Sequence, residues 1–167
     1  MKRLLTSAAL AFAMISTVAI MPAEARNTTR VEQSGWANGA ASIQNGNRNQ
    51  VNIGQDGTRH YSRAQQSGYN NYLRTEQAGT RNAIESEQHG NNNYAVAGQE
   101  GRNLRAGMYQ SGNGNVAGVA QIGRNSIATT DQVGRNNTVG VIQVGNGQDA
   151  DVIQRGNGNI SVVVQGD

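Results

Sequence analysis

Carboxamide side chains recur in this sequence at a strict spacing, and they are the groups best placed to act together. Gln occurs every 11 residues without a gap, and Gly stands two positions after each of the first twelve. A carboxamide offers hydrogen-bond donors and an acceptor, so equivalent carboxamides that a repeat brings together can bond to one another. The thirteen Gln residues that we expect to form a Gln ladder are Gln33, Gln44, Gln55, Gln66, Gln77, Gln88, Gln99, Gln110, Gln121, Gln132, Gln143, Gln154 and Gln165.

The position six residues before each Gln divides the units into two alternating families. In one family it varies, as Asn38, His60, Asn82, Leu104, Ser126 and Gln148. In the other family it is always Asn, so the true repeat spans two similar halves and is twice as long as the Gln spacing. This family predicts an Asn ladder of Asn27, Asn49, Asn71, Asn93, Asn115, Asn137 and Asn159.

Each unit of the Gln repeat fits a seven-residue strand that ends at the Gln, followed by a four-residue arc around the Gly. Strands then start at 27 and every 11 residues to 159. Alternate residues of a strand share a face, so the third and fifth positions point the same way as the Gln. None of the residues at these two positions is charged in any unit, although charged residues make up 15% of the chain. A buried face excludes charge, and exclusion at period two does not describe a helix.

Two short strands cannot bury a face alone, but stacked repeats can. We therefore predict an all-β fold, a two-sheet β-solenoid (cross-β) of 22-residue strand-arc-strand repeats with about 13 short strands. Gln then stacks on Gln and Asn on Asn at the margins of an apolar centre. Each amide bond of this kind contributes about 0.5–1.5 kcal/mol net.

Composition argues against a conventional globular enzyme. Only 36% of the chain is apolar and 4% is aromatic, which is too little for an ordinary packed core. There is no Cys for a disulfide or a thiolate zinc site, and two His residues cannot build a metal centre of their own. His60 and His89 have no neighbouring carboxylate pattern that suggests a base or a ligand. We expect no catalytic, cofactor-binding or metal-binding residues.

Residues 1–25 predict a secretory signal peptide. Lys2 and Arg3 precede an apolar run from 4 to 20, and Ala23-Glu24-Ala25 is a small-x-small cleavage site. Residues 26–167 then form a single solenoid domain. Loss of two basic residues and one acidic residue changes the net charge from +3 to +2, which is no argument by itself for nucleic acid binding.

A row of Arg side chains is expected along one edge of the solenoid. Arg59, Arg81, Arg102 and Arg124 occupy four successive arcs on that edge, where like charges repel. They are expected to act as gatekeepers, solvated charges that slow assembly and block sideways association. The alternative is an anion contact, a row of bidentate donors for a polyanionic matrix.

The two ends of the predicted solenoid favour self-assembly. Soluble solenoids need polar terminal caps, and we expect none at either end, so the end strands offer unpaired backbone groups to another copy. Such a head-to-tail contact does not close and grows into an amyloid fibre. The last strand has the composition of an aggregation-prone window, and its expected assembly contacts are Ile160, Val162, Val163 and Val164.

The pattern Asn-x-(apolar)-x-(apolar)-x-Gln-x-Gly-x-x-Asn, iterated from 27 to 165 behind a signal peptide, resembles the curlin family. Members of this family are subunits of curli amyloid fibres on Gram-negative bacteria. The resemblance implies that residues 26–167 form a curlin-type domain of a secreted protein in extracellular fibres at the cell surface, for adhesion and biofilm matrix. It implies as partners other copies of the chain, another curlin subunit, the outer-membrane curli export machinery, and abiotic or host surfaces. The role of major subunit or of minor nucleator stays open.

A soluble, monomeric β-solenoid binding module of the ice- or ion-binding type is the alternative. Ice binding favours a flat Thr array on an outer face, where this chain offers mainly Thr28, Thr129 and Thr138. A calcium roll favours recurring Asp beside Gly, and only Asp56-Gly57 fits. An enzyme is the third and weakest possibility.

Overall fold

The computed structural model describes residues 26–167, which form thirteen β-strands and short connections. The predicted signal peptide lies outside the described residues. Within residues 26–167, no helix is long and apolar enough to span a membrane. The strands are β1 (Thr28–Trp36), β2 (Gly39–Asn47), β3 (Gln50–Thr58), β4 (Tyr61–Tyr69), β5 (Tyr72–Thr80), β6 (Ala83–Asn91), β7 (Tyr94–Arg102), β8 (Arg105–Asn113), β9 (Val116–Arg124), β10 (Ile127–Arg135), β11 (Thr138–Asn146), β12 (Asp149–Asn157) and β13 (Ile160–Gly166).

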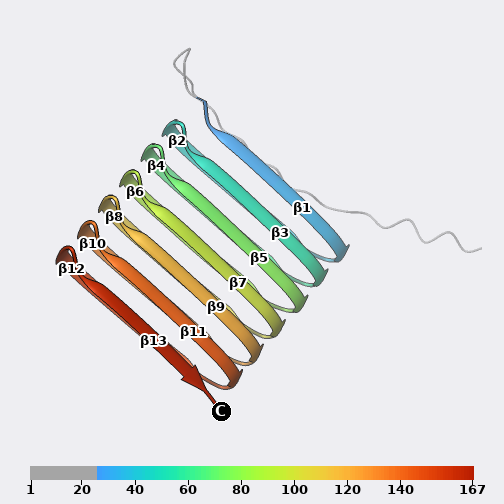
Figure 1. The fold of residues 1–167 in the computed structure, drawn as a ribbon. Coiled ribbons are helices and arrows are strands. Elements are labelled where there is room, and N and C mark those ends of the chain that lie inside the picture. The colour runs from blue at the N-terminus through green and yellow to red at the C-terminus, as the bar shows by residue number, and fades with distance from the viewer. Residues whose placement is uncertain (1–25) are drawn as a thin grey trace, which may run out of the picture.

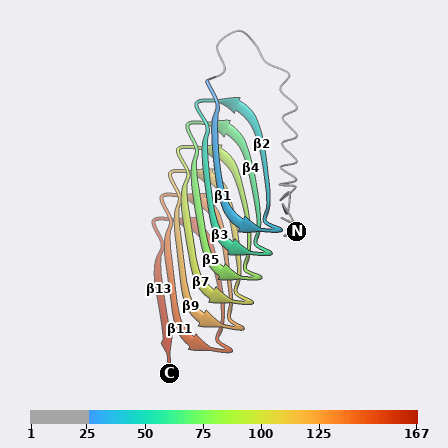
Figure 2. The same cartoon turned by 90° about the vertical axis from the view of Figure 1, so that its right-hand side faces the viewer.

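The strands wind as a solenoid in which each strand is half a turn. The odd-numbered strands form a seven-stranded sheet in the order β1-β3-β5-β7-β9-β11-β13, and the even-numbered strands form a six-stranded sheet. Figure 1 shows the turns stacked from β1 to β13, and Figure 2 shows the two layers joined by arcs. All strand pairs are parallel. The predicted two-sheet β-solenoid is confirmed.

The strands β1 to β11 each pair in register with the strand one full turn later along the chain. Gln33 lies beside Gln55, and Gly35 beside Gly57, an offset of 22 residues. The same offset holds in the other sheet, where Gln88 lies beside Gln110. Because the repeat length is constant, each position of the repeat forms its own column along the axis.

The prediction of seven-residue strands and four-residue arcs is wrong in its boundaries. The strands up to β12 have nine residues, beginning one residue later than expected and running on past the Gly, so only two residues separate consecutive strands. The backbone ladder continues around the arc because equivalent arcs stack on one another. The N–H of Arg59 donates to the carbonyl of Trp36 at 2.9 Å, and the N–H of Arg81 donates to that of Thr58 at 2.9 Å.

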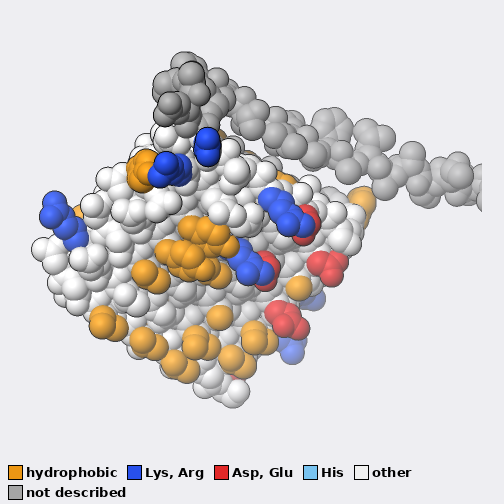
Figure 3. Space-filling model, turned by 45° about the horizontal axis from the view of Figure 1, so that its top comes forward, with side chains coloured by type: hydrophobic (Ala, Val, Ile, Leu, Met, Phe, Trp, Pro, Cys, Tyr) orange, Lys and Arg blue, Asp and Glu red, His pale blue; other side chains and the backbone are white. Residues whose placement is uncertain are grey.

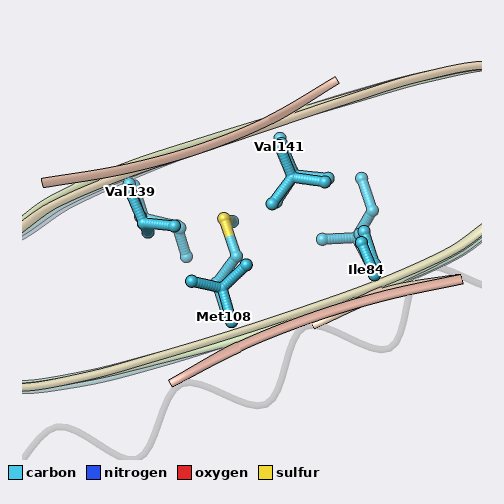
Figure 4. Close-up of a cluster of buried hydrophobic side chains, with 14 of the residues drawn as sticks. Ile84, Met108, Val139 and Val141 are labelled. Carbon is cyan, nitrogen blue, oxygen red and sulfur yellow. The ribbon is translucent and has the colours of Figure 1, made fainter. Parts of the chain in front are cut away.

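The core is a thin apolar layer between the sheets, made of the third and fifth positions of each predicted strand. From Val51 to Val152 all of these positions are buried. Figure 4 shows Val139 and Val141 pointing from one sheet toward Met108 and Ile84 of the other. On the terminal strands the equivalent positions are not fully covered: Thr29, Val31, Ala40, Ser42, Ser161 and Val163.

The Gly two residues after each Gln cannot be replaced by a residue with a side chain, for two reasons: its backbone angle and the small space around it. Gly90 has φ +106°, in the left-handed region that side chains rarely adopt. A Cβ built on Gly90 lies 2.1 Å from the carbonyl oxygen of Gly112, one turn away. The arcs therefore approach so closely that no side chain fits at this column.

We expect Gly90→Ala to lower the free energy of unfolding by about 3 kcal/mol or more, because the methyl group would meet the next backbone. Gly98→Ala is the matched control, since nothing lies within 4 Å of its built Cβ. In that variant stability should stay constant or rise by up to about 1 kcal/mol. Urea unfolding followed by circular dichroism measures both, and equal midpoints would contradict the close approach of the arcs.

Candidate functional site

The Gln side chains form two continuous columns of hydrogen bonds inside the solenoid. In each column the Nε2 of one Gln donates to the Oε1 of the Gln one turn later, as from Gln88 to Gln110 at 2.8 Å. The distances of all eleven such bonds fall between 2.6 and 3.0 Å. All eleven bonds point in the same direction along the solenoid axis. Each of the two columns therefore ends at the C-terminal face with a Gln amide hydrogen that no further Gln accepts.

The second amide hydrogen of eleven of the thirteen Gln side chains connects the two sheets. Gln88 of β6 donates to the carbonyl of Tyr72 in β5 at 3.0 Å, and Gln110 of β8 donates to Tyr94 of β7 at 3.1 Å. Both amide hydrogens are therefore used although the side chains are fully buried. A buried carboxamide without these partners would destabilise the fold.

The Asn column binds the arcs of successive turns. The Oδ1 of Asn71 accepts from the backbone N–H of Asn93 at 3.0 Å and lies 3.2 Å from its Nδ2. The Nδ2 of Asn93 also lies 3.1 Å from the carbonyl of His89 and 3.0 Å from that of Gly112. Backbone N–H to Oδ1 bonds link all seven members, from Asn27 to Asn159.

On the other edge, the variable position six residues before Gln forms the equivalent column, and this column is interrupted. His60 is buried there, with Nδ1 3.3 Å from the N–H of Asn82 and Nε2 3.1 Å from the carbonyl of Asp56. These contacts fit a proton on Nε2. Leu104 offers no acceptor to Ser126, one turn later. Only one of the two edges therefore carries an unbroken column of amides.

The four predicted Arg residues lie on one edge, but in two columns. Arg59 and Arg81 occupy the left-handed position of the arc, each with φ +58°. Arg102 and Arg124 lie in register one position earlier. The guanidinium of Arg59 stands over the ring of Trp36 at 5.4 Å, so part of its charge is engaged in a cation–π contact.

The side chain of His89 has a carboxylate neighbour that was missed in the sequence. Its Nε2 lies 2.6 Å from Oε1 of Glu87, two residues away on the same strand face. The expectation that neither His has such a neighbour is therefore wrong for His89, because residues i and i+2 share a face. The pair is partly exposed, and residues 26–167 contain no group of three metal-ligating side chains.

The outer face of the seven-stranded sheet changes character along the axis. Toward β1 it carries ion pairs such as Arg74–Glu76, where the hydrogen bond to Glu76 raises the pKa of Arg74. Figure 3 shows such pairs beside a group of hydrophobic side chains. Toward β13 the outward residues are apolar, and the exposed ones include Val116, Ile122, Ile142, Val144, Ile160, Val162 and Val164.

Two aromatic contacts on the surface follow from the repeat and were missed. Tyr72 and Tyr94 stack with centroids 4.7 Å apart and planes 8° apart. The guanidinium of Arg48 stands 5.3 Å from the centroid of the Tyr69 ring. Because Tyr72 and Tyr94 are one repeat of 22 residues apart, their stacking could have been predicted from the sequence.

The end faces are the least covered parts of residues 26–167. The strands β1, β2, β12 and β13 each pair with a single strand. The expected contact residues of β13 divide by face: Ile160, Val162 and Val164 point outward at 77%, 67% and 68% exposure, whereas Val163 packs against the core. The last strand therefore offers a backbone edge and apolar side chains together.

We expect Gln110→Leu to destabilise the protein by about 2–3 kcal/mol, because it leaves the donor of Gln88 and the acceptor of Gln132 buried without a partner. Gln50→Leu is the control, since that side chain points outward and is exposed. Its effect should stay within about 0.5 kcal/mol. Chemical unfolding measures the difference, and equal losses in the two variants would show that the column adds no stability.

Comparison with known families finds the curlin associated repeat at residues 79–110 and again at 125–156. Comparison with curated proteins gives no significant match. Both matched segments contain three consecutive Gln residues of the columns described above. The family model thus recognises the units that bring the Gln and Gly columns into register. The chain therefore contains the curlin associated repeat in two segments, in agreement with the predicted resemblance to the curlin family.

Proposed function

We propose that this protein is a secreted subunit that assembles head to tail into extracellular, curli-type amyloid fibres. The observation that carries the proposal is the contrast between the middle and the ends of the solenoid. Inward positions are buried from Val51 to Val152 and incompletely covered on β1, β2 and β13. Addition of another copy would cover these positions and pair the free strand edges.

The energetic argument rests on three features of each joint. Free strand edges expose unpaired N–H and C=O groups, which are a template for pairing. The last Gln of each column, Gln154 and Gln165, retains an Nε2 donor that no further Gln accepts. Removal of apolar side chains such as Ile160 from water adds about 25 cal/mol per Å². The contact is heterologous, so it propagates without closing.

The proposed export of this protein and its extracellular location rest on the predicted signal peptide and on the match to the curlin associated repeat. Proteins of that repeat family are structural. Under this proposal residues 1–25 are removed, and the mature protein of residues 26–167 passes the outer membrane through the curli export machinery. Its fibres lie at the bacterial surface and serve adhesion to abiotic or host surfaces and the biofilm matrix. Another curlin subunit is its partner, with this chain either as bulk subunit or as nucleator.

We expect Val163→Lys to slow fibre elongation at least about tenfold, because assembly would bury a charge on the inner face. The matched control is Ile142→Lys on the neighbouring strand β11, whose side chain points outward at 43% exposure and does not lie on an end strand. Elongation from preformed wild-type seeds, followed by thioflavin fluorescence, compares the two. Similar rates would contradict assembly through the C-terminal end, and a wild-type protein that stays monomeric at micromolar concentration would contradict the whole proposal.

We further propose that the Arg residues of the two edge columns are gatekeepers. Changing Arg59, Arg81, Arg102 and Arg124 together to Asn should shorten the assembly lag and increase fibre bundling, because like charges no longer repel. Asn suits the left-handed position, as at Asn70. The control changes Arg48, Arg63, Arg105 and Arg135 to Asn, with the same change in charge. Salt-dependent retention on heparin is measured in parallel, and a selective loss of retention would instead support an anion contact.

A further inference from the structure

Residues 26–167 form an odd number of strands, and this leaves a step at the C-terminal end of the solenoid. Each strand is half a turn, so thirteen strands make six and a half turns. The seven-stranded sheet ends at β13, whereas the six-stranded sheet ends at β12. If the winding continued, the next strand would lie on β12 and the one after it on β13.

We infer that successive copies in the fibre are rotated by about half a turn about the fibre axis. In this arrangement β1 of the next copy pairs with β12, and β2 of the next copy pairs with β13. The seven-stranded sheet of one copy thus continues the six-stranded sheet of its neighbour. The inference rests on the proposed head-to-tail assembly and specifies its joint.

The constant Gln spacing sets the register at this joint. Gln33 of the next copy stacks on Gln154, and Gln44 of the next copy stacks on Gln165. The two free Nε2 donors then meet the Oε1 atoms that begin the two columns of the next copy. At every internal step the bond runs in this same direction, as from Gln132 to Gln154 at 2.8 Å.

Three pairs of outward side chains are complementary in this register. Arg30 of the next copy lies beside Asp151 of β12, and both side chains are exposed in the single chain. On the other sheet, Ala41 and Ile43 of the next copy lie beside Val162 and Val164. An Arg–Asp pair therefore forms on one sheet, where Glu32 of the next copy lies beside Ile153, and apolar side chains meet on the other sheet. Opposite charges and apolar pairs are favourable cross-strand neighbours.

The unrotated alternative places β1 of the next copy directly on β13. Arg30 would then lie beside Val162, and Glu32 beside Val164, so charged residues would meet the most exposed apolar strand. The edge of β12 would face a missing strand, which leaves a row of backbone groups unpaired inside the fibre. Both features disfavour this joint.

A buried oxygen at the C-terminal end supports the rotated joint independently. Among residues 26–167, Oε1 of Gln148 is buried and has no hydrogen-bond partner. In this column the side-chain oxygen accepts the backbone N–H one turn later, as Oγ of Ser126 accepts from Gln148 at 3.2 Å. Rotation brings the N–H of Asn27 of the next copy to that place, whereas the unrotated joint brings it to Asn159 and leaves the Gln148 oxygen unpaired.

Cysteine cross-linking distinguishes the two joints, because residues 26–167 contain no Cys. Directly paired residues on parallel strands are about 4.8 Å apart, within the Cα range of a disulfide. The double variant Ala41→Cys/Val162→Cys reports the rotated joint. The double variant Thr28→Cys/Ile160→Cys reports the unrotated joint. Both are assembled from the mature protein under reducing conditions, oxidised as fibres, and separated on denaturing gels without reductant.

We expect a ladder of covalent multimers from Ala41→Cys/Val162→Cys, at least tenfold stronger than from Thr28→Cys/Ile160→Cys. The reverse result, or fibres in which neither pair cross-links, would overturn the half-turn rotation and leave head-to-tail assembly standing. Failure of the cysteine-free protein to form fibres would overturn the proposed function itself. Electron microscopy of the reduced samples separates these outcomes.

Discussion

The constant advance of 22 residues per turn is the constraint on which the whole structure depends. It places each Gly over a Gly, so that a neighbouring carbonyl occupies the space of a Cβ. It also places each Gln over a Gln at bonding distance. A shift by one residue would move every inward side chain to the surface. The repeat therefore keeps its phase across all thirteen strands.

The amide columns compensate for a core of small side chains. Many inward residues are Ala, Ser or Thr, which bury little apolar area, and Leu73 and Ile84 are among the largest buried side chains. The Gln side chains add bonds along each sheet and between the sheets. Because each turn pairs the backbone and Gln amides of its neighbours, the free strand edges and the ends of the Gln columns lie at the two ends of residues 26–167, where the proposed assembly would pair them.

Much of the architecture was predictable because a strict period reports both strand spacing and register. The exclusion of charge from the third and fifth positions predicted the inner face, and the count of Gln predicted the number of strands. The same offset contained further contacts, such as the stack of Tyr72 on Tyr94. The strand boundaries could not be read from the period, because they depend on backbone bonds between arcs that only meet once turns are stacked.

The sequence by itself determined the repeat, the two alternating families, the inward face and the identity of the columns, since all of these follow from spacing along the chain. Only the tertiary structure decided how the arcs of neighbouring turns contact one another. It set the guanidinium of Arg59 over the ring of Trp36 and joined the N–H of Arg59 to the carbonyl of Trp36. It also left Oε1 of Gln148 buried without a partner at the C-terminal end. These features depend on arc angles and on side chains from neighbouring turns, which the order of residues does not contain.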